Sequence, residues 1–276
     1  MRKGLIRLLP LLLAVLLTAC TGRTKEIRSY REEGIKAMAE ENYPAAVDAF
    51  RHAMAFYGTA RQDGTGIDIL RYLCEAEMKT GDYASAAGTL EKLIETDKKR
   101  QVYLDMKAVC LARGGGSLEE ALACYREAGE AGGSSGSHRD ALFSIGEVLA
   151  GSGDETMKAA ALELYREAEE KEGQSPALSL WIGKLLFEGG ETEAALQSFR
   201  DGEALADSVL AEENAGEEKV AEAQELREHL LFNQAVCLEH LEQYEEAAGI
   251  LEAVKNEYGE TEALLHELQF LSTRGK

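Results

Sequence analysis

Proline is scarce in this chain of 276 residues, which contains only three prolines and one tryptophan. β-Branched residues are also sparse and never alternate for long with polar ones, so no stretch has the pattern of a half-buried strand. Two of the prolines, Pro44 and Pro176, stand where new helices are expected to begin. Proline is tolerated there because the backbone N–H that it lacks would have no partner within the first turn of a helix. Ser175 supplies a suitable N-cap before the second of them. With alanine, leucine and glutamate dominant, the sequence predicts an all-helical protein.

Positive charge is in short supply as well. Lysine and arginine number 30 against 50 aspartates and glutamates, which gives a formal net charge of −20. Removal of the N-terminal segment that carries Arg2, Lys3 and Arg7 would make the remainder more acidic still, at −23. A surface of this sign repels nucleic-acid backbones and anionic lipid headgroups. We therefore expect no nucleic-acid partner, and membrane attachment would need a lipid rather than a basic patch.

The N-terminus has the order of a secretory signal. Three early cations precede an apolar run over residues 8–17, and small residues stand before Cys20. The string Leu17-Thr18-Ala19-Cys20 resembles the lipobox of bacterial lipoproteins, in which the cysteine is acylated and becomes the first mature residue. This resemblance implies a signal peptide over 1–19, lipidation at Cys20, a tether over 20–26 and an extracytoplasmic protein anchored to the bacterial membrane. The alternatives are an ordinary signal or an uncleaved anchor, although the run is shorter than the roughly 18–20 residues that a spanning helix needs.

An internal repeat runs through the rest of the chain. Three copies begin with a polar residue and a tyrosine, followed three residues later by alanine and four beyond that by a large residue. Because a spacing of four places two residues on one helical face, each alanine would admit a neighbouring helix beside the bulky side chain. An upstream helix carries a further small residue each time. The alanine and large pairs are Ala46/Phe50, Ala86/Leu90, Ala121/Tyr125, Ala161/Tyr165, Ala195/Phe199 and Ala247/Leu251, and the upstream small residues are Gly34, Cys74, Ala108, Gly146, Gly183 and Ala235.

This helix–turn–helix unit resembles the tetratricopeptide repeat (TPR). The resemblance covers residues 27–259 and implies a right-handed α-solenoid of about six repeats. Residues 260–276 form the C-terminal end, in which leucines recur at helical spacing between Thr261 and Leu271. Because a terminal repeat needs its apolar face covered, this segment is expected to be a capping helix with a short tail.

Membership of the TPR family would imply a concave surface lined by the first helix of each pair, where relatives bind peptides or partner helices. Aromatic anchors beside a cation suit such recognition. The alternative for any one aromatic is packing between helices. The residues that this mapping places on the inner face are Arg31, Arg71, Tyr72, Met106, Phe143, Trp181, Lys184, Phe187, Phe232 and Asn233.

Catalytic and metal-binding patterns are missing. The string Gly132-Gly133-Ser134-Ser135-Gly136, with His138 nearby, matches the sequence pattern of a nucleophile elbow. That motif requires a turn from a strand to a helix, whereas this string is expected to join two helices. Histidines are scattered, and no calcium loop or phosphate-binding glycine loop occurs. We expect no enzyme, no metal and no cofactor. The four later cysteines fall at small packing positions and are expected to be buried thiols, with a bridge between Cys110 and Cys124 as the alternative.

These features together predict an extracytoplasmic, membrane-anchored scaffold that binds a protein or peptide partner in its groove. Resemblance to bacterial TPR lipoproteins implies a role in the assembly of envelope or secretion machinery. The alternative is a solute- or glycan-binding lipoprotein of an uptake complex, which would need a closed pocket with convergent polar groups.

Overall fold

Residues 23–58, 62–132 and 135–274 are described by the computed structural model. Every regular element in these ranges is a helix. The predicted signal over 1–19 and the lipidation site Cys20 lie outside the described residues. No described helix combines the length and apolarity that crossing a membrane requires.

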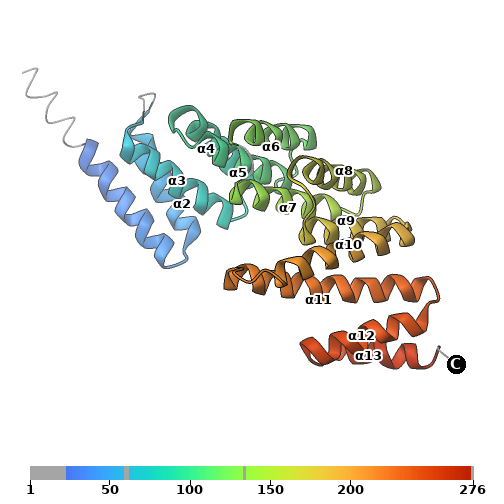
Figure 1. Ribbon diagram of the computed structural model, residues 1–276. Coiled ribbons are helices and arrows are strands. Elements are labelled where there is room, and N and C mark those ends of the chain that lie inside the picture. The colour runs from blue at the N-terminus through green and yellow to red at the C-terminus, as the bar shows by residue number, and fades with distance from the viewer. Residues whose placement is uncertain (1–22, 59–61, 133–134, 275–276) are drawn as a thin grey trace, which may run out of the picture. The chain divides into compact units, whose positions relative to one another are not determined.

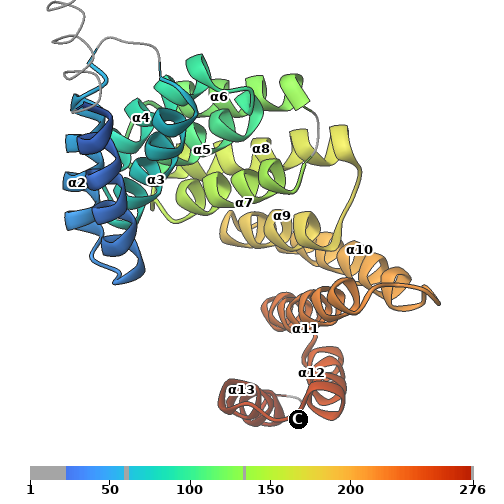
Figure 2. The same ribbon diagram turned by 90° about the vertical axis from the view of Figure 1, so that its left-hand side faces the viewer.

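The described chain divides into two compact units. The N-terminal unit extends to Ile145 and contains a helix over residues 23–39, followed by a series of paired helices (Figure 1). These are α2 (Tyr43–Ala55), α3 (Gly64–Lys79), α4 (Tyr83–Thr96), α5 (Arg100–Arg113), α6 (Leu118–Gly132) and the first part of α7 (Gly136–Ala150). From α2 to α6 each helix packs on the next one in sequence, as the turned view also shows (Figure 2).

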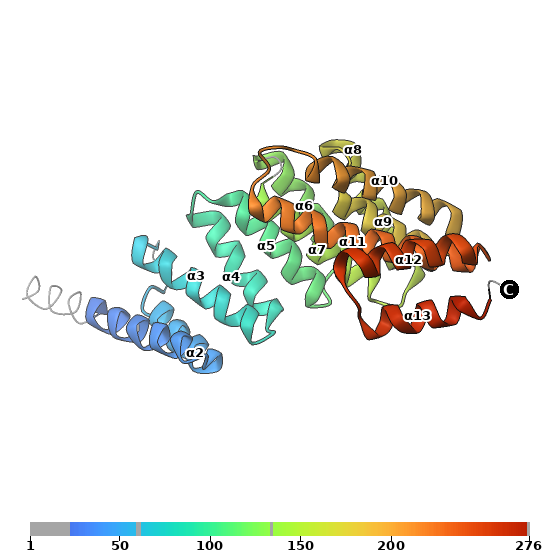
Figure 3. The same ribbon diagram turned by 60° about the horizontal axis from the view of Figure 1, so that its bottom comes forward.

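The C-terminal unit begins at Gly146. It contains the end of α7, then α8 (Glu155–Glu172), α9 (Pro176–Glu188), α10 (Thr192–Leu210), α11 (Glu217–His240), α12 (Tyr244–Tyr258) and α13 (Glu262–Ser272). From α8 onward each helix packs on the next one in sequence, and α9 also contacts α11, the first helix of the following pair (Figure 3). The last helix, α13, lies against α12 and buries Leu264 and Leu271. This is the expected capping helix, and the arrangement confirms the all-helical, TPR-like fold class.

Helix starts follow the polar residues that the sequence indicated. Asn42 accepts a hydrogen bond from the Ala45 amide before Pro44 enters α2, and Ser175 caps α9 before Pro176. After α10 the chain leaves the helical conformation, and α11 starts at Glu217 directly after Gly216. Side-chain caps of this kind also stand at the starts of α3, α4, α8 and α13.

A recurrent tight turn joins the first helix of a pair to the second. Residues Glu41, Gly81, Gly190 and Glu242 occupy the equivalent position with φ of 56°, 76°, 81° and 60°. The amide after each reaches back to the carbonyl five residues earlier, as Asn42 does to Ala37 at 2.8 Å, which is the bonding pattern of a Schellman end. Because a side chain costs energy at positive φ, the two glutamates mark positions where glycine would fit better.

The predicted small and large residues meet in the core. A Cβ on Gly34 would lie 2.5 Å from the ring of Phe50, and a Cβ on Gly146 or Gly183 would come closer still to Tyr165 or Phe199. These three rings are at most 1% exposed. In the second repeat the upstream residue is the larger Cys74 and its partner is the smaller Leu90, within one buried cluster. The volumes of the two positions thus compensate for each other, as close packing demands.

The four later cysteines are free and buried: Cys74, Cys110, Cys124 and Cys237. Burial raises the pKa of each thiol, to about 11 for Cys110 and Cys237. The alternative of a Cys110–Cys124 bridge is not realised in this structure. The thiols act as small apolar groups, as the sequence indicated.

Candidate functional site

The two arginines predicted for the inner face are engaged by acidic side chains that lie further along the chain. Arg31 forms an ion pair with Asp68 at 2.6 Å. Arg71 contacts Asp97 at 2.5 Å and donates to the Tyr103 hydroxyl at 2.8 Å. The Tyr103 hydrogen bond, helped by Arg71, lowers the pKa of Asp97 to about 2. Both arginines therefore tie one repeat to the next, and a ligand would have to share them with these carboxylates.

The other predicted residues of the N-terminal unit are half-buried. Tyr72 stacks on Phe50 with ring centroids 5.7 Å apart, and Met106 packs on the buried cluster around Leu90. Phe143 lies on α7. For Tyr72 and Met106 these contacts favour the packing interpretation that the sequence left open.

Three predicted residues of the C-terminal unit form a row on α9. Trp181 stacks on Tyr165 at 6.1 Å, and the Lys184 ammonium lies 4.9 Å from the centroid of the Trp181 ring. One turn further, Phe187 meets the His240 ring edge-on at 4.8 Å. Trp181, Lys184 and Phe187 all remain half-buried, so each has an inner face against the protein and an outer face toward solvent. A cation over an aromatic face is itself stabilising.

The remaining two residues lie on α11, which contacts α9. Phe232 and Asn233 are half-buried, and the Asn233 amide nitrogen donates to the His229 carbonyl at 2.7 Å. We call the five residues Trp181, Lys184, Phe187, Phe232 and Asn233 the α9–α11 surface. It draws on α9 and α11, the first helices of two successive pairs.

A buried histidine–aspartate pair was not foreseen. The Nδ1 atom of His138 lies 2.6 Å from Asp105, and these residues are 5% and 1% exposed. Burial raises the pKa of the Asp105 carboxyl. The His138 ring stacks on Tyr125 at 4.2 Å, and a Cβ on Gly129 would lie 3.0 Å from its Nε2. The one feature of the sequence that could have indicated this pair is Asp105 itself, an aspartate on the otherwise apolar face of α5.

This pair ties α5 and α6 to α7, and its geometry is not that of a nucleophile and base. The Ser137 hydroxyl is 3.5 Å from Asp105 and 3.0 Å from the Ser135 hydroxyl, while Ser135 accepts from the His138 backbone amide. Ser134, the central residue of the elbow-like string, lies outside the described residues. Over the described ranges, no group of histidine, cysteine, aspartate and glutamate side chains has the geometry to hold a metal ion.

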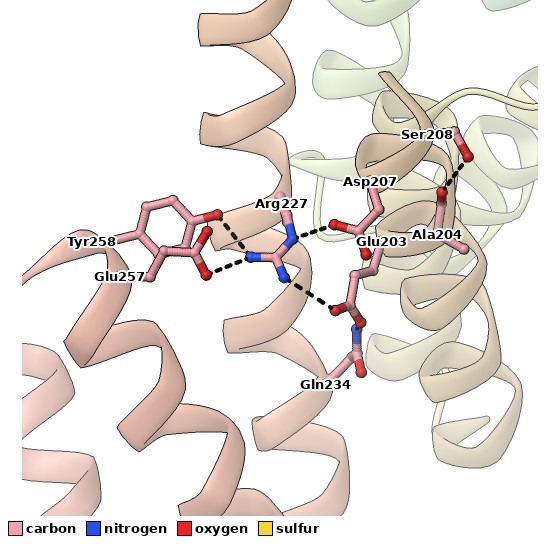
Figure 4. A network of polar contacts seen from close by, with 8 residues as sticks. All are labelled: Glu203, Ala204, Asp207, Ser208, Arg227, Gln234, Glu257 and Tyr258. Carbon is pink, nitrogen blue, oxygen red and sulfur yellow. Dashed lines mark hydrogen bonds and ion pairs between the residues drawn. The ribbon is translucent and has the colours of Figure 1, made fainter. Parts of the chain in front are cut away.

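A second unforeseen feature is the network around Arg227 on α11 (Figure 4). The guanidinium lies between two neighbouring helices and contacts acidic groups on both. It pairs with Asp207 of α10 at 2.5 Å and with Glu257 of α12 at 2.8 Å, and it donates to the Tyr258 hydroxyl at 3.0 Å. A weaker contact reaches Glu203 at 3.8 Å, which also accepts from Gln234. One cation thus joins three consecutive helices.

Comparison with known proteins agrees with this architecture. Two models described as tetratricopeptide repeat match the chain, one over residues 158–209 and the other over 229–261. Both segments lie in the C-terminal unit and contain repeats that the sequence analysis recognised. No significant match occurs among curated proteins.

Several solved structures have a similar fold at low sequence identity. The MamA protein is 16% identical with a TM-score of 0.50, covering 70% of this chain and 98% of its own. Pseudomonas aeruginosa PilF is 16% identical with a TM-score of 0.48, covering 91% and 99%. YrrB, a TPR protein with an unusual peptide-binding site, is 17% identical with a TM-score of 0.47, covering 81% and 100%. The chain therefore has an all-helical fold of the solenoid type and carries tetratricopeptide repeats in its C-terminal unit.

Proposed function

We propose that this protein is an extracytoplasmic scaffold, anchored to a bacterial membrane through lipid on Cys20, that binds a protein or peptide partner in the assembly of envelope or secretion machinery. TPR proteins in general mediate protein–protein interactions. The observation that carries the proposal is the α9–α11 surface. Two aromatic side chains and a cation lie on α9, and α11, the first helix of the following pair, contacts α9. Interface anchors are typically aromatic residues of this kind.

Replacement of both Trp181 and Phe187 by alanine is expected to remove partner capture. Both rings are half-buried, so their outer faces supply contact area that alanine lacks. The measurement is a cross-linking pull-down from native membranes, compared with the parent chain. We expect one dominant protein to be depleted roughly tenfold or more, because loss of even one interface anchor commonly weakens binding by that much.

A matched control is Phe270→Ala, because Phe270 is also a half-buried aromatic with a cation, Arg274, 5.2 Å from its ring centroid. This variant should retain the partner. Thermal melts of both variants separate binding from folding. If the double variant lost as much stability as a change in the fully buried Phe199, the residues would belong to the core and the proposed surface would be wrong. Stabilisation of the parent by a sugar instead of a peptide would favour the solute-binding alternative.

Replacement of Cys20 by alanine is expected to release the protein from the membrane without altering its helical content. The thiol is the only group proposed to carry lipid, and several acyl chains are needed for firm anchoring. Membrane fractionation with a carbonate wash, together with far-ultraviolet circular dichroism, measures both properties. Retention of the variant in the washed membrane would refute the lipid anchor while leaving the α9–α11 surface untouched.

A further inference from the structure

The first repeat contains a pocket lined by three arginines. It has a volume of about 590 Å³ and lies between the helix over 23–39 and the start of α3. Arg23, Arg28 and Arg31 line it from the first helix. The spacing of three residues makes Arg28 and Arg31 neighbours on one face of that helix, and Arg23 lines the pocket from its N-terminal end. A concave, cationic site is unusual in a chain whose formal net charge is −20.

The carboxylates that also line this pocket are already engaged. Asp68 pairs with Arg31 at 2.6 Å. Asp63 accepts from the Tyr57 hydroxyl at 2.7 Å and from the Gly66 amide at 2.9 Å, as the N-cap of α3. The pKa of Tyr57 is raised to about 12, chiefly by burial and by this bond, so its hydroxyl remains a neutral donor.

Two guanidinium charges are left without an acidic partner among the described residues. Arg23 donates only to the neutral Tyr57 carbonyl, at 2.9 Å. Arg28 has no ion pair or hydrogen bond within 23–58, 62–132 or 135–274, and its side chain is exposed. The opposite wall holds Gly64 and Thr65, the first residues of α3, where the helix dipole favours negative charge. Asp63 offsets part of the positive potential at this wall, so the arginines must supply most of the attraction.

From this arrangement we infer that the pocket binds a phosphate monoester group, free or as part of a lipid headgroup. With Asp63 counted, the three arginines and two aspartates of the lining leave a net charge of about +1, so the preference for phosphate rests on geometry. The three terminal oxygens of a phosphate monoester can accept from both guanidiniums that lack carboxylate partners, whereas a carboxylate offers only two oxygens. Planar guanidinium groups can donate two parallel hydrogen bonds to such an anion. The pocket volume admits the group together with part of the molecule that carries it.

The acidic surface elsewhere does not cancel this attraction. At physiological salt, charges more than about 8 Å apart in solvent are largely screened, so the nearest groups decide the local potential. The inference is independent of the α9–α11 surface and of lipid on Cys20.

The test uses the full chain in a Cys20→Ala background, so that an acyl anchor cannot cause membrane binding. Inorganic phosphate is titrated by calorimetry at constant ionic strength, with acetate as the carboxylate probe. Arg28→Gln should weaken phosphate binding roughly tenfold or more, the range expected for a charged hydrogen-bonding pair. Since Arg28 has no partner among the described residues, this variant should fold normally. Arg139→Gln is the matched control, because Arg139 is an exposed arginine on α7 away from the pocket.

Flotation with vesicles then identifies the source of the phosphate. Phosphatidylcholine vesicles with or without phosphatidic acid are compared for the parent and for both arginine variants. Phosphate binding together with Arg28-dependent capture on phosphatidic acid supports a lipid headgroup, and phosphate binding without vesicle capture supports a soluble phosphate ester. The inference is overturned if phosphate does not bind, if acetate binds equally well, or if Arg28→Gln binds like the parent.

Discussion

Gly183→Ala is expected to destabilise the C-terminal unit by about 1–2 kcal/mol. The added methyl would lie 2.4 Å from the ring of Phe199, which is 1% exposed. Forcing an extra carbon into a packed core costs roughly 1–3 kcal/mol, while alanine regains up to about 1 kcal/mol of helix propensity. Urea denaturation followed by circular dichroism measures the difference.

Gly249→Ala is the matched control, since it adds the same methyl to a helix of the same unit. A Cβ at Gly249 meets nothing within 4 Å. Only the propensity gain remains, so this variant should be more stable than the parent by roughly 0.5–1 kcal/mol. If both variants shifted stability in the same direction, the close approach at Gly183 would not govern the packing.

The size of the partner ring offers a second check. Combining Gly183→Ala with Phe199→Leu enlarges the small residue of the pair and shortens its large partner. The second repeat already has such a pair, Cys74 and Leu90, within one buried cluster. The double variant should lose less stability than the sum of the two single changes, because residues in direct contact couple by about 0.5–3 kcal/mol. Additive losses would contradict the volume compensation.

Arg227→Met is expected to cost the same unit about 2 kcal/mol. The Arg227 side chain is 18% exposed, and its removal deprives α10 and α12 of their shared cation. The loss arises because several ion pairs and hydrogen bonds disappear at once, whereas Asp207 and Glu257 are each 51% exposed and stay hydrated without the cation. Methionine retains the apolar stem, so the measured loss reports on the charge and its hydrogen bonds.

The control for this change is Arg200→Met. Arg200 pairs with Glu246 at 2.8 Å and also joins α10 to α12, but its side chain is 42% exposed. An exposed single pair contributes at most about 1 kcal/mol. The urea midpoints of unfolding are compared for the two variants. Equal losses of stability at the two positions would show that the Arg227 network contributes no more than an ordinary surface ion pair.

Helix locations could be predicted closely from the sequence because their signals are local. Proline and N-cap residues at Asn42 and Ser175 fix helix starts through bonds within four residues. The alternation of small and large residues at a spacing of four indicated which helical faces would meet. These features depend on neighbours in the chain, and the repeat presented them six times.

The candidate site was less predictable. The mapping put Trp181, Lys184 and Phe187 on one first helix, but only the structure shows that Tyr165 and His240 support the two aromatic rings. It also shows Arg31 and Arg71 paired with carboxylates more than 25 positions away. Partners at such separations produce no periodic pattern in the sequence. Any acidic residue at a suitable position along the neighbouring helix could form the same ion pair.

The sequence by itself determined the helical fold class, the repeat, the helix ends and the residues that fill the core, since each follows from spacing and local hydrogen bonding. The tertiary structure alone decided which polar groups are satisfied: the His138–Asp105 pair, the Arg227 network and the arginine pocket of the first repeat. Charged side chains have long reach and many candidate partners in an acidic chain. Their pairing therefore depends on how adjacent repeats are packed. Only the structure shows that Arg23 and Arg28 have no carboxylate partner among the described residues.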